Sequence, residues 1–178
     1  MTKAWPSRSR RWPKHCGSRT NRGSPWPLGD EAVQIRRRLA RGGSAEHRGH
    51  LALALKRHAH RLGRVGRHEE AAAAAGEAAH LYDLLARDDP GADRLALAAT
   101  LHLLASNLQW SSPAEALEPA RRATGILERL ARDEPATHEP NLVIMLDTLA
   151  EILDRLGRGE EARTTVSQAA GIRARTRT

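Results

Sequence analysis

Histidine side chains gather in the second quarter of the sequence and raise the question of a metal site. Five of them, His47, His50, His58, His60 and His68, lie within 22 residues. Imidazoles bind zinc and related metals when a full set of ligands surrounds the ion. His58 and His60 are two residues apart, however, so on a helix they point to different faces. His47 and His50 lack a Cys or carboxylate at ligand spacing, and we therefore expect no metal site.

Three further patterns fall short of a catalytic or cofactor site. In His68-Glu69-Glu70-Ala71-Ala72, alanine stands where a zinc protease needs its second histidine. Gly63-Arg64-Val65-Gly66 follows no predicted strand and lacks Gly-Lys-Ser/Thr, which indicates a turn between helices and not a phosphate loop. No Gly-x-Ser-x-Gly occurs, and Cys16 lies in an irregular segment that cannot hold a base beside it. We expect a protein that is not an enzyme and needs no cofactor.

The positive charge of the chain is concentrated at its N-terminus. Of the net charge of +8, residues 1–28 contribute seven Lys or Arg and no acid, which leaves 22 basic and 21 acidic side chains elsewhere. With Trp5, Trp12 and Trp26, this segment could stack on single-stranded bases and pair with phosphates. Its prolines and lack of periodicity favour an irregular extension over 1–29, and a leader without a role of its own is the simpler interpretation.

The cysteine content and the hydropathy of the sequence bear on the cellular compartment of the protein. A single cysteine, Cys16, cannot form an internal disulfide, which favours a reducing environment. No apolar run of 18 residues is present, and the charged start of the chain is not followed by the apolar stretch of a secretory signal. We expect a cytoplasmic protein without a membrane partner.

Helical periodicity accounts for the rest of the chain. Phe is absent and aromatic residues make up 3%, so the core must consist of small and branched aliphatic side chains, as in helix-on-helix packing. The first helix begins at the N-cap residue Asp30, carries Ala32, Ile35 and Leu39, and stops before Gly42-Gly43. The fold class is all-α, with seven helices expected near residues 30–41, 51–62, 70–85, 97–108, 113–130, 142–153 and 162–172.

These helices recur in pairs at a spacing of about 45 residues. Ala86-Arg87-Asp88-Asp89-Pro90 returns as Ala131-Arg132-Asp133-Glu134-Pro135, and the proline is expected to stop the helix. Small residues recur at equivalent points of the first helix and of the second: Ala59, Ala105 and Ala150, then Ala78, Ala123 and Ala169. Such self-similarity indicates stacked hairpins, so we predict an α-solenoid that presents a binding surface.

The repeat divides the chain into an extension and an array. The extension covers 1–29 and the array 30–178, with a half repeat over 30–43 and repeats over 50–91, 92–137 and 138–176. The half repeat follows from register: Ile35 and Leu39 precede Leu81 and Leu85 by 46 residues, and those leucines belong to the second helix of a unit. Residues such as Arg163 and Gln168 make the last helix polar enough to end the stack.

Over residues 30–175 this pattern resembles a tetratricopeptide repeat array. The resemblance depends on Ala59, Gly63, Ala71 and Ala78 and on their counterparts Ala150, Gly157, Ala162 and Ala169. The period exceeds the usual 34 residues, which is similar to the longer kinesin light chain type and to arrays common in high-GC bacteria. The resemblance implies a right-handed superhelix of helical hairpins that binds protein partners.

The resemblance also implies groove positions on the first helix of each pair. They are Lys56, His60 and Arg64, then His102, Ser106 and Trp110, and finally Asp147, Glu151 and Arg155. A spacing of four residues puts each set of three on one face of its helix. The groove would grade from basic through polar to acidic and could clamp a peptide or helix, with Trp110 as the apolar anchor. The simpler alternative is a set of solvated helix faces.

We therefore expect a non-catalytic scaffold that binds a protein or peptide partner. One alternative is a fragment or subunit of a larger regulatory protein that assembles with itself through the unpaired first helix. A second alternative is nucleic-acid binding through the basic N-terminal segment.

Overall fold

The computed structural model describes residues 27–40, 44–88 and 94–176, and within 27–40 it describes the side chains of residue 31 and of residues 33–38. Residues 1–26 of the predicted basic extension, with Cys16 and three tryptophans, lie outside the described residues. So do Gly42-Gly43, Asp89-Pro90 and the side chains of Ala32 and Leu39. The last three residues of the extension, 27–29, are described and belong to a helix, so the prediction that they are irregular is wrong.

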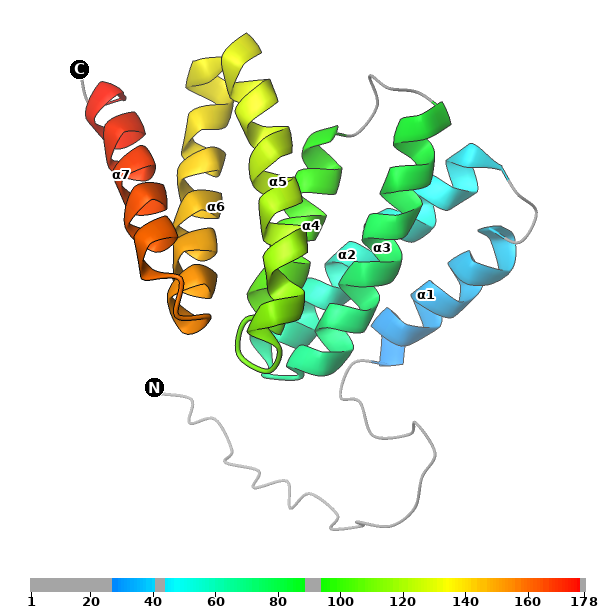
Figure 1. Ribbon diagram of the computed structural model, residues 1–178. Coiled ribbons are helices and arrows are strands. Elements are labelled where there is room, and N and C mark those ends of the chain that lie inside the picture. The colour runs from blue at the N-terminus through cyan, green and yellow to red at the C-terminus, as the bar shows by residue number, and fades with distance from the viewer. Residues whose placement is uncertain (1–26, 41–43, 89–93, 177–178) are drawn as a thin grey trace, which may run out of the picture.

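The described part of the chain is all-α, as predicted, and contains seven helices that follow one another across the molecule in chain order (Figure 1). Each helix packs against the next one in the sequence. Their bounds are α1 Pro27–Ala40, α2 Ala45–Arg64, α3 His68–Asp88, α4 Arg94–Leu108, α5 Pro113–Asp133, α6 Pro135–Arg155 and α7 Gly159–Arg175.

Beyond neighbouring pairs, the close backbone contacts among described residues join α2 to α4 and α4 to α6. The helices of the other set, α3, α5 and α7, are connected by side chains that span a longer gap. Arg122 on α5 pairs with Asp83 on α3 at 2.7 Å, and Arg121 pairs with Glu161 on α7 at 2.9 Å. The even-numbered helices therefore form the closer-packed layer.

Alanine accounts for the close approach of the helices. All six alanines that recur at equivalent positions are buried: Ala59, Ala105, Ala150, Ala78, Ala123 and Ala169. A methyl group fills little space, so larger aliphatic side chains from the facing helix fit against it. The leucines and Met145 that surround these alanines form the core, with Leu55, Leu101, Met145, Leu146 and Ile152 almost fully enclosed.

The two turns that the sequence matched are alike, but their register differs from the predicted one. Gly66 and Gly157 both adopt positive φ, at 80° and 72°, a conformation that glycine adopts without steric cost. In both turns the next residue, an arginine, donates its backbone N–H to a leucine carbonyl and its side chain to a glutamate three residues on. Gly157 thus corresponds to Gly66, and the predicted match with Gly63 is wrong.

Gly63 has a different reason to be glycine. A Cβ at this position would lie 2.8 Å from Oδ1 of Asn107, a buried side chain of α4. The amide of Asn107 donates to the carbonyl of Leu103 at 2.7 Å, and its oxygen lies 3.0 Å from Nδ1 of His68. Gly63 therefore allows α2 to meet α4, because its missing side chain makes room for a fixed polar group.

Two helix boundaries differ from the predictions because proline opens a helix as readily as it follows one. α1 begins at Pro27, three residues before the predicted N-cap Asp30. Pro135 was expected to stop a helix, but it is the first residue of α6, one residue after α5 ends. Proline lacks an N–H that the first turn would leave unpaired and has a preset helical φ. The junction between the second and third pairs is therefore Glu134 and not residue 137.

The buried face of α1 is also rotated from the predicted one. Ile35 was aligned with Leu81, which is partly buried, yet the side chain of Ile35 is 50% exposed, while Val33 is buried against α2 and α3. α1 has close backbone contacts with α2 alone among the described helices. A helix with one main neighbour buries a narrow stripe, so Ile35 falls outside it.

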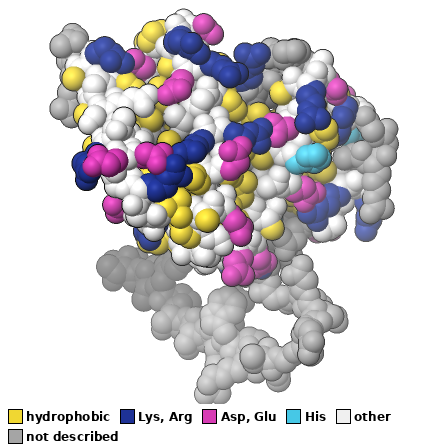
Figure 2. All heavy atoms as spheres, viewed as in Figure 1, with side chains coloured by type: hydrophobic (Ala, Val, Ile, Leu, Met, Phe, Trp, Pro, Cys, Tyr) yellow, Lys and Arg dark blue, Asp and Glu magenta, His cyan; other side chains and the backbone are white. Residues whose placement is uncertain are grey.

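Charged side chains of both signs lie next to one another across the face shown in Figure 2. Many of the described arginines belong to ion pairs, such as Arg48 with Asp88 and Arg158 with Glu161. Pairs of this kind on a surface contribute at most about 1 kcal/mol each. None of the helices in the described ranges is long and apolar enough to cross a membrane.

Candidate binding groove

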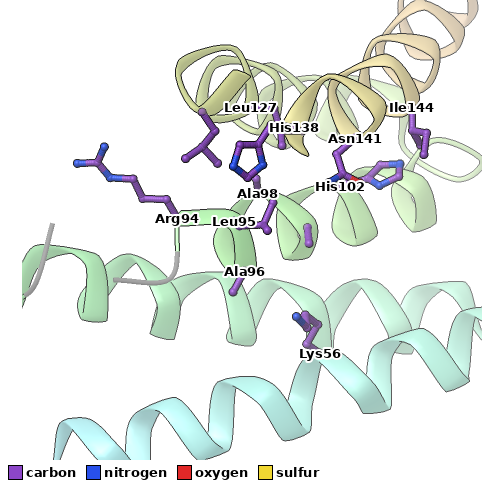
Figure 3. A pocket seen from close by; sticks show the side chains of 12 residues that line it. Lys56, Arg94, Leu95, Ala96, Ala98, His102, Leu127, His138, Asn141 and Ile144 are labelled. Carbon is purple, nitrogen blue, oxygen red and sulfur yellow. The ribbon is translucent and has the colours of Figure 1, made fainter. Parts of the chain in front are cut away.

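A groove of about 980 Å³ opens between α2, α4 and α6, and we call it the central groove. Figure 3 shows Lys56 reaching toward it from α2 on one side, with His138, Asn141 and Ile144 coming from α6 on the other. Its described lining consists of Lys56, Arg94, Leu95, Ala96, Ala98, Ala99, His102, Leu127, Leu130, His138, Asn141 and Ile144.

A second hollow of about 530 Å³, the side groove, continues from the central one between α2 and α4. The two share Lys56, Ala99 and His102, so they form one connected surface. The side groove adds Arg57, His60, Arg61, Leu103 and Ser106 to the lining.

Apolar side chains stand exposed in the central groove. Leu95 on α4 is 41% exposed and Ile144 on α6 is 53% exposed. Leu127 and Leu130 of α5 lie behind them and are more enclosed. Covering large aliphatic side chains releases about 25 cal/mol for each Å² removed from water. The groove can therefore bind an apolar side chain favourably.

His102 lies where the two grooves meet and connects α4 to α6. Its Nε2 is 3.0 Å from Oγ1 of Thr148, and that hydroxyl donates its own proton to the carbonyl of Ile144. Nε2 must therefore be the donor, which leaves Nδ1 as an acceptor when the ring is neutral. Burial lowers the pKa of His102 below its ordinary value of 6.5, so the neutral form is favoured.

His138 contributes a polar atom without a partner. Its side chain is only 9% exposed, and Nδ1 is buried with no hydrogen-bonding group within reach. The residue lies in the first turn of α6, and its ring faces the central groove beside Ala98 (Figure 3). A buried ring nitrogen that makes no hydrogen bond costs about 1–3 kcal/mol. A ligand group in the groove could supply the missing bond.

Four of the nine predicted groove residues come together on this surface. Lys56 and His102 line both grooves, and His60 and Ser106 line the side groove. Lys56 also lies over the ring of Tyr82, 5.9 Å from its centre.

Trp110 and Arg155 come together at another place. Trp110, just beyond the end of α4, is 62% exposed, and the guanidinium of Arg155 at the end of α6 stacks 3.9 Å from its ring centre. Neither residue lines the two grooves described above. The predicted apolar anchor is thus already covered in part by a cation of the same chain.

The predicted acidic end is partly neutralised. Asp147 forms an ion pair with Arg173 of α7, and neither Asp147 nor Glu151 lines either groove. Arg64, at the end of α2, is exposed and also lies outside both linings. The described grooves are therefore basic and apolar in place of the predicted gradient from basic to acidic.

The sequence reasoning missed the apolar part of the groove. The apolar residues that it missed are Leu95, Leu127, Leu130 and Ile144, and it also missed the polar His138 and Asn141 beside them. A signal was present at Ile144, because it belongs to a run of apolar residues, Leu142 to Leu146, that exceeds the stripe one buried face needs. No such signal marks His138 or Asn141, since their place depends on how α6 sits beside α4.

The described residues contain no group of three His, Cys, Asp or Glu side chains placed to hold a metal ion. In comparisons with known proteins, no family model matches the chain, and no curated protein matches it.

Proposed function

We propose that this chain is a non-catalytic scaffold that holds a peptide or helix of another protein in the central groove. The single observation that carries the proposal is the exposure of Leu95 and Ile144 inside a groove between α2, α4 and α6 that α5 closes from behind. Isolated exposed apolar residues are common on protein surfaces, but a concave apolar patch bordered by polar groups is typical of a binding site.

We further propose that the seven helices form an α-solenoid of the tetratricopeptide type. Sequential packing, the closer layer of α2, α4 and α6, and six buried alanines at repeating positions support it. Helices of one layer then line a concave surface, on which such arrays bind their partners.

Self-association is the second candidate, and one observation favours it. The two end helices each carry a half-exposed branched side chain, Ile35 on α1 and Val166 on α7. Contact between the α1 end of one molecule and the α7 end of another would be heterologous and could extend into a filament.

Two matched variants distinguish these functions. Ile144 and Val166 are both branched, exposed to 53% and 50%, and lie on different helices, so Ile144→Glu and Val166→Glu are equivalent changes at different places. Each variant would be used as bait for a displayed library of random peptides, with its mass followed by light scattering.

The proposal predicts that Ile144→Glu loses at least about tenfold in enrichment of bound peptides, because a carboxylate replaces an apolar contact. Val166→Glu should capture the same peptides as the unchanged protein. If no captured peptide depends on Ile144, the groove does not bind protein segments. A mass that rises with protein concentration and falls in Val166→Glu would favour self-association.

A further inference from the structure

The two grooves are lined by cations without acids. Among their described lining residues are Lys56, Arg57, Arg61 and Arg94, together with three histidines, and no Asp or Glu. A concave surface with charge of one sign concentrates partners of the opposite sign.

None of these four cations is neutralised by an acid of the described part of the chain, although the ammonium of Lys56 lies over the ring of Tyr82. Within the described residues, none of Lys56, Arg57, Arg61 and Arg94 forms an ion pair with a carboxylate. Arginines outside the grooves do so, as Arg48 of α2 does with Asp88 and Arg122 of α5 with Asp83. The positive charge of the grooves is therefore available to a partner.

The apolar and polar parts of the central groove lie beside this charge. Leu95 and Ile144 provide an exposed apolar surface, and His138, whose buried Nδ1 has no partner, is a residue of the same lining. An occupant that satisfies all three features must bring negative charge, an apolar side chain and a hydrogen-bonding group.

Building on the proposed function, we infer that the occupant is an acidic protein segment that also carries a large apolar side chain. Its carboxylates lie against the cations of α2, and its apolar side chain lies between Leu95 and Ile144. A backbone or side-chain polar group hydrogen-bonds Nδ1 of His138. Charge-assisted hydrogen bonds to Arg and Lys are about twice as strong as neutral ones, so the cations select the partner.

Two other occupants fit less well. The N-terminal segment of this chain carries seven Lys or Arg and no acid in residues 1–28, so its charge opposes the groove. Single-stranded nucleic acid binds by stacking bases on aromatic rings, and the described lining has no Trp, Tyr or Phe. In an acidic protein segment, a carboxylate pairs with the cations while an apolar side chain of the same segment enters the groove.

The width of the groove determines how long a peptide probe should be. Packed helices lie about 8–10 Å apart, so three of them span about 20 Å, which about six extended residues cover. We would use two fluorescent peptides of about eight residues with the same central leucines, one rich in glutamate and the other with lysine in place of glutamate.

The experiment measures binding of both peptides to the full chain by fluorescence anisotropy. Arg61→Glu is the test variant, and Arg129→Glu is the control because Arg129 is exposed on α5 outside both grooves. Both changes alter net charge equally. The glutamate peptide should bind more tightly than the lysine peptide, and Arg61→Glu should weaken it by about tenfold or more while Arg129→Glu changes it little. Lys56→Gln, which adds no repulsion, should weaken it in the same direction.

Several outcomes would overturn the inference. Equal binding of the two peptides would do so, as would equal effects of Arg61→Glu and Arg129→Glu, or preference for a single-stranded oligonucleotide over the glutamate peptide. If the proposed function itself is wrong, the result is a different one, because binding of the peptides captured from the library then does not depend on Ile144. If they depend on Ile144 but are not acidic, the groove binds protein segments and the inferred partner chemistry is wrong.

Discussion

At the scale of single residues, His102 links the groove to the stability of the fold. Its Nε2 donates to Thr148, and burial lowers the pKa of the ring. The folded protein therefore prefers the neutral imidazole more than the unfolded chain does.

The sign of the pH dependence follows from this preference. As the pH falls through 6.5, the ordinary pKa of the ring, His102 binds a proton in the unfolded state before it does so in the folded state. The free energy of unfolding therefore decreases until the pH reaches the pKa of His102 in the folded protein. His102→Gln keeps a donor for Thr148 and does not titrate. We expect the variant to lose less stability than the unchanged protein between about pH 8 and about pH 5.

Urea denaturation of both proteins across this pH range measures the effect. The other histidines are common to both, so their contributions cancel in the difference. Parallel pH profiles would show that His102 has the same pKa in the folded and unfolded states.

At the scale of helices, two glycines should respond to the same substitution with opposite signs. Gly63 of α2 faces Asn107, where an added Cβ would lie 2.8 Å from Oδ1, whereas a Cβ on Gly76 of α3 would meet nothing within 4 Å. Gly63→Ala should cost about 1–3 kcal/mol by overpacking. Gly76→Ala should add about 0.5–1 kcal/mol, because alanine is the better helix former.

Chemical denaturation of the two variants, with helicity checked by circular dichroism, tests this prediction. A neutral or stabilising Gly63→Ala would mean that Asn107 can move aside without loss of its bonds to Leu103 and His68.

The sequence was sufficient for the number and order of the helices, because each has a stripe of apolar residues at helical spacing, and a Gly or Pro lies between neighbours or at the first position of the next helix. It was insufficient where one residue type has two uses. Pro135 fits both the end of one helix and the start of the next, and Gly63 fits both a turn and a helix contact. Only the packing of α2 on α4 distinguishes the uses of Gly63.

The candidate site was predictable in part, for a similar reason. The spacing of four residues predicted that Lys56 and His60 lie on one face of α2, and both line the side groove. The ion pair of Asp147 with Arg173 joins residues 26 apart on two helices, and the enclosure of His138 depends on α4. Neither is encoded in the period of a single helix.

At the scale of the molecule, contacts are local in sequence. Each described helix packs on its neighbours, and the two terminal helices α1 and α7 have close backbone contacts with one helix each, α2 and α6. Stability in such an arrangement is approximately the sum of neighbouring interfaces, so the ends open at lower cost than the middle.

Hydrogen exchange followed by mass spectrometry should therefore show the fastest amide exchange, within the described helices, in α1 and α7 and the slowest in α4 and α5. Destabilising one end, by Ile172→Ala in α7, should speed exchange in α7 and α6 and leave α2 nearly unchanged. Uniform protection, or an equal response at the far end, would mean that the helices unfold as one cooperative unit.

Because aromatic residues are scarce, the intrinsic fluorescence of the protein comes from a few known positions. The described residues include one tyrosine and one tryptophan: Tyr82 beneath Lys56, and Trp110 beneath Arg155. Once Trp5, Trp12 and Trp26 are replaced by phenylalanine in the full chain, the remaining indole emission comes from the junction of α4 and α6. The single tyrosine, Tyr82, lies in the core beneath Lys56, and its emission, at a shorter wavelength than that of indole, reports on the basic side of the groove.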